Sequence, residues 1–283
     1  MAAEPEDALS RVPMTFAADR SLGDRSANRA HLEDQAMSRL QGKKIAVIGA
    51  SRGVGRVIAG RALNAGAEVL AVARSQEGLA ELQASLPGID VFALDATSED
   101  APDRLFGFMT PDVVVLSLGA IPPTQAVQNL SWQDFSVNWN TDVKASFLFC
   151  KAALQGSLPP GARIILISSG AAIGGSPISG GYAGAKRMQL FLAGYCQREA
   201  DRLGLDLVFY GLAPARIMPE TALGAAAVEG YARYLGMNAA DFVQGITDRQ
   251  SPEDVADAVV ALAAGARHTA SAFVVNAHGL AEV

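Results

Sequence analysis

The chain has 283 residues, of which 50% are hydrophobic and 6% aromatic, and its formal net charge at pH 7 is −6. This length and composition exclude a disordered or fibrous chain and suit one large α/β domain with a substantial core. The negative charge gives no electrostatic reason to expect nucleic acid or an anionic membrane surface as a partner. Without an apolar run of spanning length or a secretory signal, we expect a cytoplasmic protein that is not bound to a membrane.

The first 40 residues differ from the rest of the chain. They are charged, rich in Ala, Ser and Arg, and carry no sustained apolar period. We interpret residues 1–40 as a flexible extension or as an arm that becomes ordered on a partner. An alternative is that the natural protein starts at Met37, where the more globular sequence begins. Residues 41–283 are predicted to form a single catalytic domain.

Short apolar runs alternate with helical segments from Lys43 onward. The runs are rich in Val, Ile, Leu and Ala without alternating polar residues, which is typical of parallel strands buried on both faces. Seven strands are predicted, over residues 45–49, 68–73, 91–94, 113–118, 164–168, 207–210 and 272–276. Helices are predicted between them, over residues 53–65, 76–86, 99–109, 131–156, 179–203 and 252–265. This order predicts a doubly wound Rossmann-type α/β fold with helices on both faces of the sheet.

The segment from about 215 to 250 is longer than an ordinary connection. In doubly wound folds, a connection after a late strand lies near the carboxyl ends of the strands, where ligands bind. We therefore predict that this segment is a substrate lid. The alternative is a pair of surface helices that do not contact the substrate.

A glycine-rich turn follows the first predicted strand directly. Glycines at a strand-to-helix turn let the backbone approach a pyrophosphate closely, and the helix N-terminus adds amide donors and a positive dipole end. The sequence therefore predicts a dinucleotide site. Its residues are Gly49, Ser51, Arg52, Gly53, Val54 and Gly55.

The end of the second predicted strand indicates which dinucleotide is used. An acidic residue there favours NAD, but this strand ends in Ala73-Arg74-Ser75. Arg74, together with Arg52 of the glycine turn, is suited to pair with a 2′-phosphate, so we expect NADP(H). The alternative is that both arginines are solvated surface charges. Asp95, after the third strand, is placed to accept a hydrogen bond from the adenine amino group or to cap a turn.

A tyrosine and a lysine stand four residues apart in Tyr182-Ala183-Gly184-Ala185-Lys186, on one face of a predicted helix. The lysine ammonium stabilises the phenolate, so we expect it to lower the tyrosine pKa and make the phenol a usable general acid/base. Ser169 lies thirteen residues earlier, after the fifth predicted strand, where its hydroxyl can donate to a substrate carbonyl.

With these features, residues 40–283 resemble the short-chain dehydrogenase/reductase family, of the classical NADP(H)-preferring type. The glycine turn, the Ser-to-Tyr spacing, the Tyr-x-x-x-Lys pair, Asp95-Ala96 and the run from Ser251 to Ala256 carry the resemblance. It implies a seven-stranded sheet of order 3-2-1-4-5-6-7. It implies that Tyr182 is the acid/base, that Ser169 orients the carbonyl, and that Lys186 binds the nicotinamide ribose. It also implies a homodimer or homotetramer, assembled through helices 131–156 and 179–203.

The sequence departs from the family pattern at cofactor positions. Leu116-Ser117-Leu118-Gly119 replaces the usual Asn-Asn-Ala-Gly, so we expect Gly119 to keep the close approach to the cofactor and Ser117 to replace one polar contact. Pro214-Ala215 replaces Pro-Gly, and Ile217 still stands where the backbone would contact the nicotinamide carboxamide.

A further departure bears on mechanism, because Asp142 stands where the family has a catalytic Asn. In the family this residue holds, mainly through its backbone carbonyl, a water that is linked to the lysine. Asp142 keeps that carbonyl, and its carboxylate can also pair with Lys186 and raise the lysine pKa. We therefore expect retained activity with a shifted pH optimum.

The predicted function is an NADPH-dependent carbonyl reductase or alcohol dehydrogenase that acts on a small, mostly apolar ketone or aldehyde. One alternative is an NADP(H)-binding sensor or scaffold without catalysis; another is an epimerase or dehydratase on the same fold. We expect no metal, because the three histidines are scattered. Cys150 and Cys196 are expected to be buried free thiols.

Overall fold

The computed structural model describes residues 40–283 of the chain. The predicted extension and the alternative start at Met37 lie outside the described residues, except for Leu40. Leu40 is fully buried in the core. None of the helices in residues 40–283 has the length and apolarity needed to cross a bilayer.

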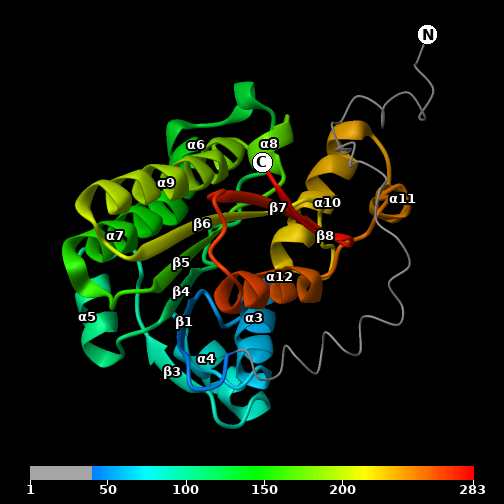
Figure 1. Cartoon of the computed structure of the whole chain (residues 1–283). Coiled ribbons are helices and arrows are strands. Elements are labelled where there is room, and N and C mark those ends of the chain that lie inside the picture. Colours follow the sequence, from blue (N-terminus) through cyan, green and yellow to red (C-terminus); the bar gives the residue numbers. More distant parts are fainter. Residues whose placement is uncertain (1–39) are drawn as a thin grey trace.

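The structure is built on one twisted sheet with the strand order β3-β2-β1-β4-β5-β6-β7-β8 (Figure 1). The seven predicted strands are confirmed, all pair in parallel, and they have the predicted order. Their bounds are β1 Lys44–Ile48, β2 Glu68–Ala73, β3 Asp90–Ala93, β4 Val113–Leu116, β5 Ala162–Ile167, β6 Leu207–Pro214 and β7 Ala272–Asn276. The order reverses between β1 and β4, which opens a crevice at their carboxyl ends.

The prediction of exactly seven strands is wrong by one strand. Residues Gly279–Glu282 form β8, which pairs antiparallel with β7 at the edge of the sheet. A tight turn joins the two strands: the backbone N–H of His278 donates to Asn276 Oδ1 at 2.8 Å, and Gly279 has a φ of 118°. This φ lies in the region that favours glycine, so Gly279 lets the chain fold back as a hairpin.

Helices cover both faces of the sheet, as predicted (Figure 1). Successive strand residues point to opposite faces: Ile45 and Val47 pack with one set of helices, and Ala46 and Ile48 with the other. The first set is α3 Gly53–Asn64, α4 Gln76–Ser85 and α12 Pro252–Ala264. The second set is α5 Ala101–Phe108, α7 Lys144–Ala152 and α9 Tyr182–Leu203.

The helix predicted over 131–156 is not one regular helix. It consists of α6 (Trp132–Asn138), a π-helical turn (Trp139–Val143), α7 and a second π-helical turn (Ala153–Ser157). π-Helical turns are uncommon and occur often at functional sites. The first of them contains Asp142, so the position where the sequence departs from the family also has unusual backbone geometry.

The predicted lid segment contains two helices, α10 (Ala222–Leu235) and α11 (Ala239–Gln244). They stand apart from the sheet, on the right of Figure 1. A small separate core holds them together, and it includes Ile178 from the loop between α8 (Ala171–Gly174) and α9. This segment is therefore packed against the loop that precedes Tyr182.

Candidate active site

A cavity of about 1100 Å³ lies at the carboxyl ends of β1 to β6. The segments that follow these six strands line it, and so does the lid segment from Ile217 to Thr247. All predicted site residues line this one cavity. They are Gly49, Ser51, Arg52, Gly53, Val54, Gly55, Arg74, Asp95, Ala96, Ser117, Gly119, Asp142, Ser169, Tyr182, Lys186, Pro214 and Ile217.

The glycine turn gives one end of the cavity the form that a dinucleotide needs. A Cβ on Gly55 would lie 2.2 Å from Gly49 O, so only glycine allows this close turn. Gly53, at φ 55°, faces open space, with only Thr221 Cβ at 4.0 Å. No side chain caps the N-terminus of α3. The first amide groups of this helix are thus available to an anion such as a pyrophosphate.

Two guanidinium groups belong to this end of the cavity. Arg52 precedes α3 and Arg74 follows β2, and both side chains are exposed to solvent. Glu81 of α4 and Asp95 after β3 also line the cavity at this end, so two carboxylates accompany the two cations. Asp95 Oδ1 accepts hydrogen bonds from the backbone N–H of Thr97 at 3.0 Å and from its hydroxyl at 2.8 Å. These bonds lower the Asp95 pKa and show that it caps a turn.

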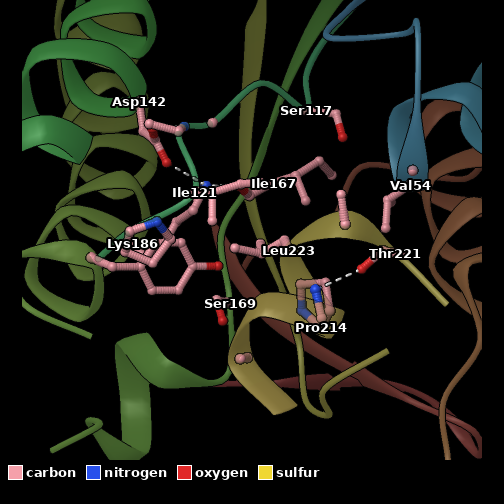
Figure 2. A pocket seen from close by; sticks show the side chains of 18 of the residues that line it. Val54, Ser117, Ile121, Asp142, Ile167, Ser169, Lys186, Pro214, Thr221 and Leu223 are labelled. Carbon is pink, nitrogen blue, oxygen red and sulfur yellow. Dashed lines mark hydrogen bonds and ion pairs between the residues drawn. The ribbon is translucent and has the colours of Figure 1, made fainter. Parts of the chain in front are cut away.

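The predicted catalytic side chains gather at the other end of the cavity. Figure 2 shows Lys186, Asp142 and Ser169 on one side, with Val54 and Thr221 opposite. β5 ends just before Ser169, and α9 begins at Tyr182. The Lys186 ammonium lies 5.6 Å from the centre of the Tyr182 ring and donates to Ile167 O at 3.1 Å. Tyr182, Lys186 and Ser169 therefore lie together, as their spacing in the sequence predicts.

Asp142 and Lys186 form a buried ion pair. The distance from Lys186 Nζ to Asp142 Oδ2 is 3.1 Å, and the side chains are 6% and 0% exposed. The other carboxylate oxygen, Oδ1, accepts from the backbone N–H of Ala120 at 3.0 Å, in the loop after β4. A Cβ on Gly119 would lie 2.9 Å from Asp142 Oδ2, so glycine at 119 makes room for the carboxylate.

Burial and charge act in opposite directions on Lys186. Burial lowers the lysine pKa, but the charge of Asp142 and the Tyr182 side chain raise it more, so the net pKa is raised. The expectation for Lys186 is thus met.

Lys186 lowers the Tyr182 pKa as expected, but the net pKa of this phenol is raised. Burial raises this pKa, and the Asp142 carboxylate raises it further. Lys186 and a hydrogen bond with Ser169 lower it, but by less. The phenol of the isolated chain is therefore held in its protonated form.

Three buried polar residues near Asp142 were missed in the sequence. Asn138 donates to Ala120 O at 2.7 Å and lies 3.3 Å from Asp142 Oδ1. Ser146 donates to the Asp142 backbone carbonyl at 2.7 Å and accepts from Gln189 Nε2 at 2.8 Å. The carbonyl expected to serve the proton relay thus already accepts one hydrogen bond. Asn138, Asp142 and Ser146 are spaced four apart, a helical pattern that was readable in the sequence.

Other expectations concern cysteines and metals. Cys150 and Cys196 are free and buried, as predicted. Within residues 40–283, no group of three His, Cys, Asp or Glu side chains is placed to hold a metal ion.

Comparisons with known proteins agree with this geometry. The family model described as short chain dehydrogenase matches residues 43–218. A 3beta-hydroxysteroid dehydrogenase from Mediterraneibacter gnavus is 28% identical over 159 residues, which are 53% of this chain and 58% of that protein. An L-xylulose reductase from Bos taurus is 26% identical, over 46% of this chain and 53% of that protein. A D-erythrulose reductase from Gallus gallus is 29% identical, over 46% and 53%. The chain thus spans about half the length of the curated relatives it matches.

Solved structures show the same fold. A short-chain dehydrogenase/reductase from Brucella melitensis, described as a glucose/ribitol dehydrogenase, superimposes with a TM-score of 0.68. It is 22% identical and covers 80% of this chain and 91% of its own. The family match extends from β1 through Ser169, Tyr182 and Lys186 to the start of the lid segment. The chain belongs to the short-chain dehydrogenase family, whose members use NAD(H) or NADP(H).

Proposed function

We propose that the protein is an NADPH-dependent carbonyl reductase, or the corresponding alcohol dehydrogenase, acting on a mostly apolar ketone or aldehyde. The observation that carries this proposal is that Tyr182, Ser169 and Lys186 line the same cavity as the uncapped N-terminus of α3. One end of this cavity fits a dinucleotide and the other supplies an acid/base. When bound, the nicotinamide would supply or accept the hydride.

The chain's own residues account for the proton. Ser169 donates a hydrogen bond to the carbonyl oxygen of the substrate and orients it. The Tyr182 phenol, kept protonated by burial, donates its proton to the same oxygen as negative charge develops there. Lys186 bears a charge beside the phenolate that remains and stabilises it. For alcohol oxidation, the same residues act in reverse.

Asp142 distinguishes this site from the family pattern. Its carboxylate holds Lys186 by a 3.1 Å ion pair, and through Ala120 it also holds the loop after β4. A buried ammonium without a partner tends to lose its proton. We infer that Asp142 keeps Lys186 charged over the working pH range, so the activity is retained and its pH dependence is altered.

The choice of NADP(H) rests on Arg52 and Arg74. A 2′-phosphate placed between two guanidinium groups can form charge-assisted, bidentate hydrogen bonds. No acidic residue ends β2, where a carboxylate would bind the ribose hydroxyls of NAD. The fit of the rest of the dinucleotide to Gly49, Ser117, Gly119, Pro214 and Ile217 is the same for both cofactors.

The choice of substrate rests on the walls of the cavity. Ile121, Ile173, Ile178 and Leu223 line it between the loop after β4, the loop before Tyr182 and the lid segment. Apolar walls with few polar groups bind a mainly apolar molecule. Among the matched proteins, the hydroxysteroid dehydrogenase has an apolar substrate in its name, whereas the xylulose and erythrulose reductases have sugars.

We also propose that the protein forms a homodimer or homotetramer through α6, α7 and α9. Large hydrophobic side chains are exposed on these helices and on the π-helical turn between α6 and α7: Phe147 is 51%, Phe191 56%, Tyr195 49% and Trp139 40% exposed. Clustered exposed apolar residues are typical of protein–protein interfaces. Light scattering of the purified protein tests this proposal, and a monomer at micromolar concentration would contradict it.

The proposed activity is tested by following NADPH absorbance in the presence of ketones, aldehydes, quinones, sugars and imines. We expect oxidation with ketones and a preference for NADPH over NADH. Tight NADPH binding without turnover of any substrate would contradict the proposal and favour a sensor or scaffold. Conversion of a substrate without net change in NADPH would favour an epimerase or dehydratase.

A further inference from the structure

The lid segment brings a second group of hydroxyls to the cavity. The Tyr231 hydroxyl of α10 lies 2.6 Å from Ser176 Oγ, in the loop before α9. Both residues line the cavity, and neither belongs to the proposed catalytic or cofactor sites. Tyr231 is only 9% exposed, and its ring stacks on Phe242 at 5.5 Å with an interplanar angle of 4°. The pair is therefore held rigidly.

The hydrogen bond within this pair leaves one proton unused. Burial raises the Tyr231 pKa, so the phenol stays protonated and can donate to Ser176. A serine hydroxyl has one proton of its own to donate. Among residues 40–283, no acceptor for the Ser176 proton is found. Because Ser176 lines the cavity, this proton is available to a ligand there. A hydroxyl that already accepts a bond from Tyr231 is a stronger donor to a ligand oxygen.

A third hydroxyl, that of Ser179, lies in the same loop. Ser179 is 6% exposed and lines the cavity, and in the described part of the chain its buried Oγ makes no hydrogen bond. The Ser179 carbonyl oxygen accepts from the backbone N–H of Tyr182 at 3.0 Å, so Ser179 lies in the turn that leads into the proposed acid/base. Because the Ser179 hydroxyl is buried and cannot be reached from the cavity, Ser176 is the candidate donor on this loop.

The charges that line the cavity are already accounted for. Its cationic side chains are Arg52, Arg74, Lys186 and Arg216. Lys186 is paired with Asp142 and Arg216 with Asp248. The remaining two follow β1 and β2, on the other side of β4 from the loop after β5. The wall around Ser176 therefore suits a neutral oxygen better than a carboxylate or a phosphate.

We propose that Ser176, supported by Tyr231, binds a second, neutral oxygen of the substrate. The substrate class is then an apolar ketone or aldehyde that carries one additional hydroxyl or carbonyl group. A sugar is disfavoured, since its many hydroxyls would face the isoleucine and leucine side chains of the same cavity. This inference rests on the proposed reductase function, which it makes more specific.

The test uses matched ketones that differ in one oxygen. Three pairs cover increasing distances between the two oxygens: 4-hydroxycyclohexanone against 4-methylcyclohexanone, 4-(4-hydroxyphenyl)cyclohexanone against 4-phenylcyclohexanone, and dihydrotestosterone against the same steroid ketone without its ring-D hydroxyl. We measure kcat/KM for NADPH oxidation with each compound. In at least one pair, we expect the hydroxylated member to be favoured by about tenfold, the value of one well-made hydrogen bond.

Variants then assign that preference to residues. Ser176→Ala removes the proposed donor, and Tyr231→Phe removes the group that supports Ser176. Each is expected to lower kcat/KM for the hydroxylated ketone and leave the value for its deoxy partner within about twofold. Tyr234→Phe is the matched control, since Tyr234 lies on the same helix, is 52% exposed and does not line the cavity. Ser157→Ala is the serine control, because Ser157 lies outside the cavity.

The outcomes separate the two proposals. NADPH oxidation without discrimination in any pair, or discrimination that Ser176→Ala and Tyr231→Phe leave unchanged, would overturn the second-oxygen site and leave the reductase proposal intact. No oxidation of NADPH with any ketone would overturn the reductase proposal and this inference with it. A deoxy ketone that loses activity equally in the variants would show a merely structural role and contradict the inference.

Discussion

At one end of the cavity, Lys186 and Asp142 form an ion pair with almost no exposure, whereas at the other end Arg52 and Arg74 are exposed to solvent. The first pair has lost its hydration, and each ion depends on the other. The two arginines keep their hydration and repel each other only weakly through water. Charges that line one cavity can thus serve separate purposes. The buried pair sets protonation and local stability, and the exposed pair is available to an anionic ligand.

The largest expected effect is a loss of protein stability when the buried ion pair is broken. Lys186→Met leaves the Asp142 carboxylate buried without its counter-ion, which is expected to lower the free energy of unfolding by about 3 kcal/mol. Urea unfolding at pH 7 measures this loss. Lys151→Met is the matched control, because Lys151 is an exposed lysine on α7. Equal stability of the two variants would mean that the buried pair contributes nothing to stability.

A smaller effect is expected at the exposed arginines. Arg74→Glu replaces a cation with an anion beside the expected 2′-phosphate, and the ratio of kcat/KM for NADPH to that for NADH should fall at least about tenfold. Stability should hardly change, because the side chain is exposed. Arg104→Glu on α5, outside the cavity, controls for the change in net charge. An unchanged cofactor ratio would assign the preference to other residues or show that none exists.

The smallest change tests the charge of Asp142 alone. In Asp142→Asn, the attraction that raises the Lys186 pKa is lost and burial lowers that pKa, so the lysine should deprotonate at lower pH. The Tyr182 pKa should fall as well, because the carboxylate no longer repels the phenolate. The alkaline limb of the pH–rate profile is therefore expected to move to lower pH. An unchanged profile would rule out a special role for the carboxylate.

The pH dependence of stability follows from the same pair. The folded-state pKa of Lys186 is raised, so its contribution is fully present below the unfolded lysine pKa, near 10.4, and is lost as pH rises through the folded value. Alkaline unfolding followed by circular dichroism should therefore start at lower pH in Asp142→Asn than in the unchanged protein. The same onset in both proteins would contradict this assignment.

The sequence predicted the parallel part of the fold because its strands are continuous apolar runs, such as Val113–Leu116. Such runs are typical of parallel strands that are buried on both faces of a sheet. β8 could not be recognised in this way, since Gly279–Glu282 is short and largely exposed and depends on pairing with β7. The π-helical turn around Asp142 was also unpredictable, because local propensity does not distinguish it from an α-helix.

In the site, the local motifs were predictable and the long-range partners were not. Tyr182 and Lys186 lie one helical turn apart, so their spacing alone brings them together. Ser176 and Tyr231 are 55 positions apart and meet only because the lid helices pack on the loop before α9. The sign of the Tyr182 pKa shift also required the structure, since it depends on how deeply the phenol is buried.

The central claim is that Tyr182 is the acid/base of an NADPH-dependent reductase. The most direct test compares the unchanged protein with Tyr182→Phe on the best ketone substrate, measuring kcat/KM together with the Kd of NADPH by fluorescence. The account predicts a fall in kcat/KM of at least about 100-fold with a nearly unchanged Kd. Full activity of Tyr182→Phe would contradict it.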